Sequence, residues 1–462
     1  MRSGLPGRQA GGTRRAVMDL WWDVAGGGMS LQVAFPDAVR RESVQQQTFD
    51  LAIVGGLGHV GLPMGLVFAH KGLQVALYDL NEEKAARIRQ GRMPFIEHGA
   101  APILEEVLRR KTLHVSSAPG VVSRARLVMI AVGTPIDANL NPNLRALLEV
   151  IDQLKSALRP EQTLLIRSTV YPGTCRQILK RLSAGGGTWH LAYCPERIAQ
   201  GYAIQELPQL PQLVAGLSDK ALQDATALFA LVAPQVIPVS MEEAELAKLF
   251  ANAWRYIQFA VSNQFYMIAR AFGVDFNQLR TVLMHGYGRA ATLPTAGFAA
   301  GPCLLKDTMQ LAAFNTNNFL LGHAAMMVNE GLPNFLVEDL RRRWDLSQAT
   351  VGILGMAFKA EVDDIRDSLS YKLGKILRFH GATVLYSDEF TQDPTFISKE
   401  RLLADSDVVI VGVPHAAYRQ LAVPAGVELV DLWGILRPAG ADAAAHQLAE
   451  HPSPVPGTRC RG

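Results

Sequence analysis

Residues 49–61 read FDLAIVGGLGHVG. The apolar run Phe49–Val54 is typical of a buried strand, and it leads into a glycine loop at 56–61 that matches G-x-G-x-x-G and then into a helical stretch. A second apolar run, Val75–Tyr78, is closed by Asp79, at about the distance of 20 residues that this pattern calls for. The order of strand, glycine loop, helix, strand and acid predicts a dinucleotide-binding unit.

Each part of this pattern has a physical task. Glycines let the backbone approach the pyrophosphate, and the positive N-terminus of the helix supports its charge. Asp79 accepts hydrogen bonds from the ribose hydroxyls and would repel a 2′-phosphate, so the sequence predicts NAD rather than NADP. The predicted cofactor-binding residues of this motif are Gly56, Gly58, His59, Val60, Gly61 and Asp79.

Further apolar runs continue the alternation of strands and helical stretches. They are Leu127–Val132, Leu164–Arg167, Leu191–Cys194 and Val236–Val239. Thr134, Thr169 and Glu196 follow three of these runs, and strand carboxyl ends line the ligand crevice of an open parallel sheet. The three residues are therefore candidates to face a cofactor or substrate, although each one taken singly is better explained as a cap or turn.

The stretch from about Met241 to Phe272 contains no proline or glycine and keeps apolar side chains at helical spacing. It predicts a helix of roughly 45 Å, a length that usually bridges domains or subunits. On its other face, Lys248 and Asn252 lie four residues apart and project together, with Asn263 further along. Periodicity alone does not separate a functional pair from a solvated face with a helix ion pair.

Residues 301–307 read GPCLLKD, which predicts a helix start with Cys303 at its N-terminus and Pro302 at the first helical position. The helix dipole and Lys306 are expected to favour the Cys303 thiolate, and Asp307 follows at i+4 on the same face. Because most isolated cysteines are packing residues or inert thiols, the assignment of Cys303 as a nucleophile depends on the rest of the chain.

The remaining sequence predicts a second α/β unit. A helical region from about Thr308 to Arg343 precedes Thr350, where a degenerate strand and turn begin. Two more apolar runs, Thr383–Tyr386 and Val408–Val413, follow as strands. The two ends of the chain are rich in Gly, Arg and Gln or in Ala, Pro and Gly, and both are expected to be flexible.

Composition excludes several classes of protein. The 462 residues are 49% hydrophobic and 19% charged, and 45 basic against 42 acidic residues give a net charge of +3 without long basic runs. A small anionic ligand fits this balance better than a nucleic acid. The four cysteines form no C-x-x-C pair, so neither a metal site nor a disulfide framework is predicted, and the cytoplasm is the expected location. No apolar run of signal or membrane-spanning length predicts export or anchoring.

From about residue 50 to 435 the chain resembles the UDP-glucose/GDP-mannose dehydrogenase family. The matching motifs, in family order, are GLGHVGLP at 56, VGTP at 132, STVYPGT at 168, YCPERIAQG at 193, EAELAKLFANAWR at 243, GPCLLKD at 301 and GMAFKAEVDDIRDS at 355. The resemblance implies an α/β fold of two Rossmann-like doubly wound parallel-sheet domains joined by a long central helix. The implied divisions are a flexible leader 1–47, an NAD-binding domain 48–240, a central dimerisation and catalytic region 241–345, a C-terminal nucleotide-sugar domain 346–437 and a flexible tail 438–462.

The resemblance also implies an activity, the NAD-dependent four-electron oxidation of the C6 alcohol of a nucleotide sugar to the uronic acid. Cys303 resembles the family nucleophile that forms a thiohemiacetal and then a thioester. Lys248 and Asn252 would stabilise the oxyanion, while Asp307, with Thr169 and Glu196, would position and deprotonate water.

By the same resemblance, Thr134 and Arg366 would contact NAD. The residues implied for the nucleotide sugar are Glu196, Lys248, Asn252, Arg289, Gly301 and Lys359. Arg289 would extend into the site of a neighbouring subunit, so a homodimer or a higher homo-oligomer is expected.

The substrate expected from the resemblance is an NDP-glucose, carried by UDP or dTDP, with a UDP-ManNAc type N-acetylhexosamine as the alternative. The chain departs from the family where Gln200 and Gln264 replace a frequent Glu and Leu305 a frequent Pro, so slowed or altered thioester hydrolysis is expected at worst. A single-hydride dehydrogenase would have no use for Cys303. A catalytically silent nucleotide-binding protein would have to explain why all of the implied catalytic residues are present.

Overall fold

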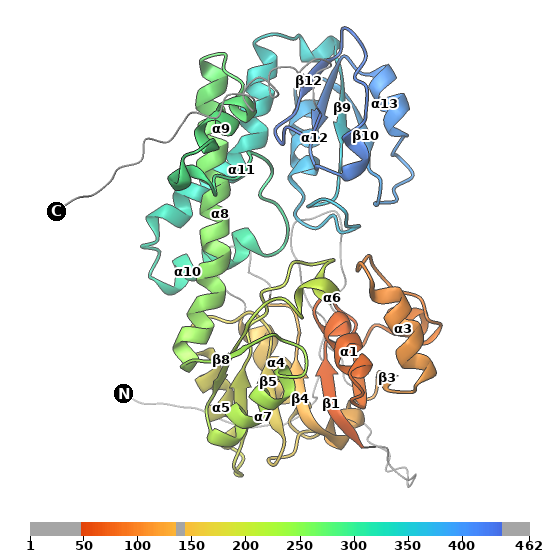
Figure 1. Ribbon diagram of the computed structural model, residues 1–462, viewed down its shortest axis with the longest axis vertical. Helices are drawn as coiled ribbons and strands as arrows, with labels where there is room; N and C mark the ends of the chain where they lie inside the picture. The colour runs from red at the N-terminus through yellow and green to blue at the C-terminus, as the bar shows by residue number, and fades with distance from the viewer. Residues whose placement is uncertain (1–47, 135–143, 437–462) are drawn as a thin grey trace, which may run out of the picture. The chain divides into compact units, whose positions relative to one another are not determined.

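The computed structural model describes residues 48–134 and 144–436 (Figure 1). The predicted leader 1–47 and tail 438–462 lie outside the described residues. The chain divides into two compact units. The first takes its described residues from Met1–Arg92, Pro102–Glu196 and Leu210–Ala244, and the second from Met93–Ala101, Arg197–Gln209 and Glu245–Gly462.

The first unit is built on an eight-stranded sheet with the order β3-β2-β1-β4-β5-β6-β7-β8. The strands are β1 Phe49–Val54, β2 Val75–Tyr78, β3 Leu113–Ser116, β4 Ala125–Ile130, β5 Thr163–Ile166, β6 His190–Tyr193, β7 Gln212–Gly216 and β8 Val236–Pro238. Every pairing is parallel except β6 with β7, where Ala192 faces Gly216. The first six strands follow the order 3-2-1-4-5-6 of a dinucleotide-binding sheet, which confirms the predicted fold class.

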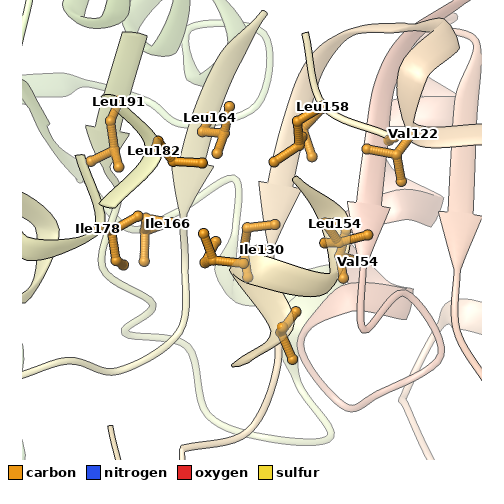
Figure 2. Packing of buried hydrophobic residues seen from close by; sticks show 14 of the residues in the cluster. Val54, Val122, Ile130, Leu154, Leu158, Leu164, Ile166, Ile178, Leu182 and Leu191 are labelled. Atoms are coloured by element: carbon orange, nitrogen blue, oxygen red, sulfur yellow. The ribbon is translucent and has the colours of Figure 1, made fainter. Parts of the chain in front are cut away.

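Helices connect these strands. They are α1 Gly61–His70, α2 Glu82–Arg89, α3 Ala100–Arg109, α4 Leu144–Leu154, α5 Thr174–Ser183 and α7 Asp219–Phe229, with the 3₁₀ turn η1 Pro119–Arg124. Figure 2 shows part of their packing on the sheet, with Leu164 and Ile166 of β5 close to Ile178 and Leu182 of α5 in one buried cluster. Each such fully buried aliphatic side chain contributes about 1.5–3 kcal/mol, so this packing holds the strand ends in place.

The second unit contains the long helix α8 Met241–Ala271, whose first residues belong to the first unit, and a four-stranded parallel sheet. The sheet has the order β10-β9-β11-β12, with β9 Thr350–Leu354, β10 Thr383–Ser387, β11 Val408–Val411 and β12 Glu428–Val430. Its helices are α6 Ala203–Glu206, α9 Phe276–Met284, α10 Leu304–Phe314, α11 Leu320–Arg341, α12 Leu369–Phe379 and α13 Lys399–Asp405. Helix α8 runs beside α11 (Figure 1), and Tyr256 and Ala260 of α8 share a buried cluster with Ala325 of α11.

The helical region predicted from about Thr308 to Arg343 consists of two helices. Helix α10 ends at Phe314 and α11 begins at Leu320. Between them, Thr316 and Asn317 have φ values of 51° and 58°, a left-handed conformation that an α-helix excludes and that Asn tolerates better than most residues.

Two short segments, 93–101 and 197–209, lie within the predicted domain 48–240 but group with the second unit. Asp363 accepts a hydrogen bond from the Ile96 N–H at 3.1 Å, and Glu97 accepts one from the Gly201 N–H at 3.1 Å. These contacts join the two segments to each other and to the loop after β9. The predicted domain boundaries remain a prediction.

Candidate functional site

The glycine loop of the first unit is shaped by steric need. A Cβ on Gly61 would lie 2.3 Å from the Gly55 carbonyl oxygen, so no larger residue allows the tight turn from β1 into α1. A Cβ on Gly58, by contrast, would meet only that same oxygen at 3.4 Å, an ordinary contact. The chain itself therefore does not require glycine at position 58, and a pyrophosphate lying close to the loop would explain it.

Asp79 lies directly after β2, beside this loop. Its Oδ2 accepts a hydrogen bond from the Leu57 N–H at 3.1 Å, and its Oδ1 accepts one from the Asn81 N–H at 3.1 Å. The carboxylate is thereby fixed next to the helix N-terminus, where Val60 is the N-cap and His59 is half-buried. The helix N-terminus and the Asp79 carboxylate together fit a dinucleotide that places its diphosphate over the loop and its ribose against Asp79.

Thr134 and Thr169 meet at the carboxyl ends of β4 and β5. The buried Thr134 donates its hydroxyl hydrogen bond to the Thr169 carbonyl at 2.8 Å. This bond ties two neighbouring strand ends at the edge where an open parallel sheet holds its ligand.

Glu196 is held by a residue that the sequence analysis missed. Arg167 is almost fully buried and donates to Glu196 Oε2 from Nε at 2.9 Å and from its terminal Nη2 at 2.5 Å. The same guanidinium donates to the Gln212 side chain at 2.8 Å and to the Cys194 carbonyl at 3.0 Å. An arginine directly after an apolar strand was the available signal, since buried guanidinium groups are rare unless paired.

Cys303 is the N-cap of α10, at the end of a loop that glycine makes possible. Gly301 has φ +96°, and a Cβ there would lie 2.4 Å from the Phe358 ring. The Cys303 residue is exposed, and its carbonyl accepts the Asp307 N–H at 2.8 Å. The prediction that Cys303 stands at a helix N-terminus is confirmed, although Pro302 precedes the helix and does not occupy its first position.

Asp307 links α10 to α8. Its carboxylate is buried, with Oδ2 accepting a hydrogen bond from Asn252 Nδ2 at 2.5 Å and Oδ1 lying 3.1 Å from the Lys306 ammonium. The structure therefore brings the predicted residues Asp307 and Asn252 together with Lys306. The Asn252 side chain faces α10, the helix that begins after Cys303.

The electrostatics of Cys303 differ from the expectation. Desolvation and the negative charge of Asp307 raise the pKa of the Cys303 thiol, and the positive charges of Lys306, Lys248 and Arg366 oppose this only in part. The expectation of a lowered pKa counted the helix dipole and Lys306 but not the carboxylate one turn away. Without a ligand, the group is therefore chiefly a thiol at neutral pH.

The raised pKa gives a prediction for thiol alkylation. In a Cys460→Ser background, which removes the tail cysteine, iodoacetamide is expected to modify Cys303 slowly at pH 7 and faster as pH rises above the ordinary thiol value of about 8.5. Asp307→Asn removes the negative charge, so it should lower the Cys303 pKa and shift the alkylation profile to lower pH. The rate is followed by mass spectrometry of the Cys303 peptide. An unchanged or upward-shifted profile would contradict the assigned role of Asp307.

Lys248 lies one turn before Asn252 on α8 and is 8% exposed. Within the part of the chain that the structure describes, its ammonium group makes no hydrogen bond or ion pair, although its charge acts on Cys303. An ammonium that is partly removed from water and has no anion beside it is stabilised when an anion binds there. This site therefore favours an anion, or an oxygen that becomes negative during a reaction.

Lys359 and Arg366 lie on the loop that follows β9. Lys359 Nζ sits 4.9 Å from the Tyr202 ring centroid, and burial together with Arg255 lowers its pKa. Arg366 donates to the buried Asp364 with Nη2 at 2.6 Å, and the Gln200 amide donates to the same carboxylate at 2.7 Å. Gln200, one of the departures from the family pattern, thus serves as a donor to Asp364, which a Glu carboxylate could not do while ionised.

Arg289 is separate from this cluster. It is exposed on the short 3₁₀ turn η2, Gly288–Ala290, and none of the described contacts joins it to Cys303 or Lys248. The loop before Cys303 is held by another residue, Asn263 of α8, which is fully buried, so the solvated face that periodicity left open does not apply to it. Its amide nitrogen donates to the Gly297 carbonyl at 3.0 Å, and its amide oxygen accepts the Gly297 N–H at 2.8 Å.

Comparison with known proteins places this geometry in a family. The profiles of the UDP-glucose/GDP-mannose dehydrogenase family match the NAD binding domain at 50–232, the central domain at 242–330 and the UDP binding domain at 352–438. The chain belongs to this family. It is a nucleotide-sugar dehydrogenase by class, and NAD is its cofactor.

Several relatives are similar over most of their length. A UDP-N-acetyl-D-mannosamine dehydrogenase from Pyrococcus horikoshii is 28% identical, covering 79% of this chain and 90% of its own. The GDP-mannose 6-dehydrogenase of Azotobacter vinelandii is 28% identical, covering 84% and 97%. Two solved structures each have a TM-score of 0.78: a UDP-D-ManNAc dehydrogenase from P. horikoshii, with 27% identity and coverage of 84% and 97%, and a UDP-glucose dehydrogenase from Pyrobaculum islandicum, with 25% identity and coverage of 86% and 96%.

Two features are absent from the described residues. Across 48–134 and 144–436, no helix combines the length and hydropathy needed to cross a membrane. In the same ranges, no group of three or more His, Cys, Asp or Glu residues is arranged to hold a metal ion.

Proposed function

We propose that this protein oxidises the C6 alcohol of a nucleotide sugar to the uronic acid in two successive steps, with a thioester at Cys303 between oxidation and hydrolysis. The observation that carries the proposal is the cluster around Cys303. Acyl transfer needs a nucleophile, a base and an oxyanion donor, and the cluster offers an exposed thiol at a helix N-terminus, a fixed carboxylate at Asp307 and the Lys248 ammonium, which has no partner among the described residues.

The proposed reaction removes two hydrides from C6, one in each of two oxidations, and when bound one molecule of NAD would supply the acceptor for each. After the first, the substrate is an aldehyde and the alcohol proton has left to solvent. The Cys303 sulfur then adds to the aldehyde carbon to form a thiohemiacetal, whose oxidation leaves a thioester. Water adds to the thioester carbonyl, and the carbon–sulfur bond breaks to release the acid and the thiol.

Lys248 and Asn252 are proposed to bind the C6 oxygen when it carries negative charge. The Lys248 ammonium belongs to a largely buried residue and has no carboxylate partner among the described residues, so it can interact with that oxygen. Asn252 donates one amide hydrogen to Asp307 and has a second one left for the substrate. Asp307, with Thr169 and Glu196, is proposed to position and deprotonate the attacking water.

Lys359 and Arg366 are proposed to act on phosphates. The lowered pKa of Lys359 shows that its charge is poorly solvated, and a nucleotide diphosphate would stabilise that charge. Arg366 is proposed to contact NAD, as Thr134 is, and its guanidinium is already oriented by Asp364. Gly301 and Arg289 complete the proposed substrate contacts, Arg289 from a neighbouring subunit.

A homodimer through α8 is part of the proposal. A stripe of large apolar side chains is exposed along this helix at helical spacing. It consists of Phe250, Trp254, Val261, Phe265, Ile268 and Phe272, with exposed fractions from 41% to 80%. Exposed apolar surface of this extent marks an interaction face, and a second copy presenting the same stripe would cover it.

Light scattering after size exclusion tests the dimer. The wild-type chain is expected to run at twice the monomer mass, and Trp254→Glu combined with Phe265→Glu should give monomers, because two charges would be buried at the interface. Phe379→Glu is the matched control, since Phe379 is 85% exposed but lies on α12. A monomeric wild-type protein at micromolar concentration would overturn this part of the proposal.

For the sugar, we propose a UDP-linked N-acetylhexosamine of the ManNAc type ahead of NDP-glucose. The UDP-N-acetyl-D-mannosamine dehydrogenase names among the relatives support this order, although a UDP-glucose dehydrogenase has the same TM-score. The test is NADH formation with UDP-ManNAc, UDP-GlcNAc, UDP-glucose, dTDP-glucose and GDP-mannose at equal concentration. The highest kcat/KM is expected with UDP-ManNAc. A preference for a glucose nucleotide would reverse the order, and no NADH from any of the five would contradict the proposed function.

A further inference from the structure

A buried histidine lies beyond the carboxyl end of β11, one of the two inner strands of the second sheet. His415 follows β11, and its side chain is fully buried. Its Nε2 lies 3.2 Å from Asp388 Oδ2, and its Nδ1 lies 3.1 Å from the backbone nitrogen of Glu361. The Phe390 and Tyr418 rings pack on it at 5.0 and 5.3 Å. The mechanism proposed above makes no use of this residue.

The partners of the imidazole define its tautomer. The Glu361 N–H is only a donor, so His415 Nδ1 must accept and carries no proton. The proton of the neutral ring is therefore on Nε2, which donates to Asp388. His415 in this form connects the end of β10 to the loop after β9.

Asp388 fixes the start of that loop. One carboxylate oxygen accepts the N–H groups of Met356 at 2.6 Å and Ala357 at 3.0 Å, in addition to His415. The other accepts the N–H groups of Phe390 and Thr391, both at 2.8 Å. Burial alone would raise the pKa of Asp388, but His415 and the backbone donors lower it well below the ordinary value. Asp388 is therefore ionised at neutral pH, and its carboxylate accepts hydrogen bonds from other residues of the same chain.

Hydrogen bonds of Glu361 hold the loop at a second point, just beyond Lys359. Glu361 has φ +63°, an uncommon conformation for a non-glycine residue that its surroundings must maintain. Its N–H is bound by His415, and its Oε1 accepts the Ala416 N–H at 2.7 Å. The segment 356–361 is therefore held at both ends, and Lys359 lies between the two points.

From these contacts we infer that His415 is a positioning residue for the nucleotide sugar. By bridging Asp388 and Glu361, it holds the segment 356–361 in the conformation that presents Lys359. The inference rests on the proposed function only in taking Lys359 as a substrate contact. The holding of the segment by His415 is independent of the reaction.

Three variants separate the two hydrogen bonds. His415→Asn keeps an acceptor near the Nδ1 position, His415→Gln keeps a donor near the Nε2 position, and His415→Ala removes both. His380→Ala is the matched control, because His380 is the C-cap of the neighbouring α12 and its ring lies near Glu338 at 4.0 Å and Phe379 at 5.2 Å, away from the segment 356–361. Thermal melting identifies any variant that fails to fold, and the Asn and Gln variants retain the test if the Ala variant is lost.

Two readouts distinguish this inference from the proposed function. Hydrogen–deuterium exchange of the full chain without substrate should show faster exchange in 356–361 for His415→Ala, with smaller increases for His415→Asn and His415→Gln, and no change for His380→Ala. With the active nucleotide sugar, KM should rise by about tenfold to a hundredfold while KM for NAD stays constant. Unchanged exchange in 356–361 would overturn the inference even if the enzyme is active. Faster exchange with an unchanged sugar KM would overturn the link to Lys359.

Discussion

Cys303→Ala is expected to lower the rate of uronic acid formation by at least about 1,000-fold, because the removal of a catalytic nucleophile leaves only binding and electrostatic contributions. The thiol is needed to convert the aldehyde into a tetrahedral centre that still carries a hydrogen. The first oxidation does not use sulfur, so any remaining turnover should end at the aldehyde. The acid and the aldehyde are separated and quantified by mass spectrometry.

Cys175→Ala provides the control for this experiment. Cys175 is a buried thiol on α5 in the core of the first unit, so its loss should affect stability and leave the product unchanged. Acid formation by Cys303→Ala at the wild-type rate would exclude the thioester. It would reduce Cys303 to a residue that only packs at the start of α10.

Lys248→Met is expected to lower kcat by about 100-fold to 1,000-fold, the usual effect of losing one donor to a developing oxyanion. The methionine side chain has a similar length and fills the same buried space, so the fold should tolerate it. KM for the nucleotide sugar should change little, because the charge on C6 oxygen develops during the reaction. Steady-state kinetics with the active nucleotide sugar measure both parameters.

Lys375→Met is the matched control, since Lys375 is exposed on α12 and should show wild-type kinetics. Lys248→Arg keeps the charge and is expected to recover only part of the activity, because the planar guanidinium does not fit the space of an ammonium. A Lys248→Met enzyme with unchanged kcat and a raised KM would assign the residue to substrate binding in the ground state.

Local pattern was sufficient to predict the dinucleotide-binding elements. Strands β1 and β2 have the predicted bounds, because apolar runs that end in glycine or acid leave little choice of register. Helix α8 begins at Met241 as predicted and ends one residue early, since its long apolar stripe has helical periodicity throughout. The position of Cys303 at a helix start also followed from the sequence, because Gly-Pro is a local signal.

The features that were missed depend on residues far apart in the chain. Arg167 binds Glu196 and Gln212 across neighbouring strands, and no spacing rule connects them. The raised pKa of Cys303 depends first on the desolvation of its thiol by surrounding parts of the chain, which the sequence does not give. Helical periodicity left the environment of Asn263 open, and only the structure places Gly297 against it.

The central claim is a four-electron oxidation through Cys303, and counting NADH tests it most directly. A limiting amount of the active nucleotide sugar is consumed completely with excess NAD, and NADH is measured by absorbance against the acid formed. The account predicts two NADH per sugar for the wild type, with all of the product as acid. One NADH per sugar, with the aldehyde as the product, would contradict it and leave Cys303 without a catalytic role.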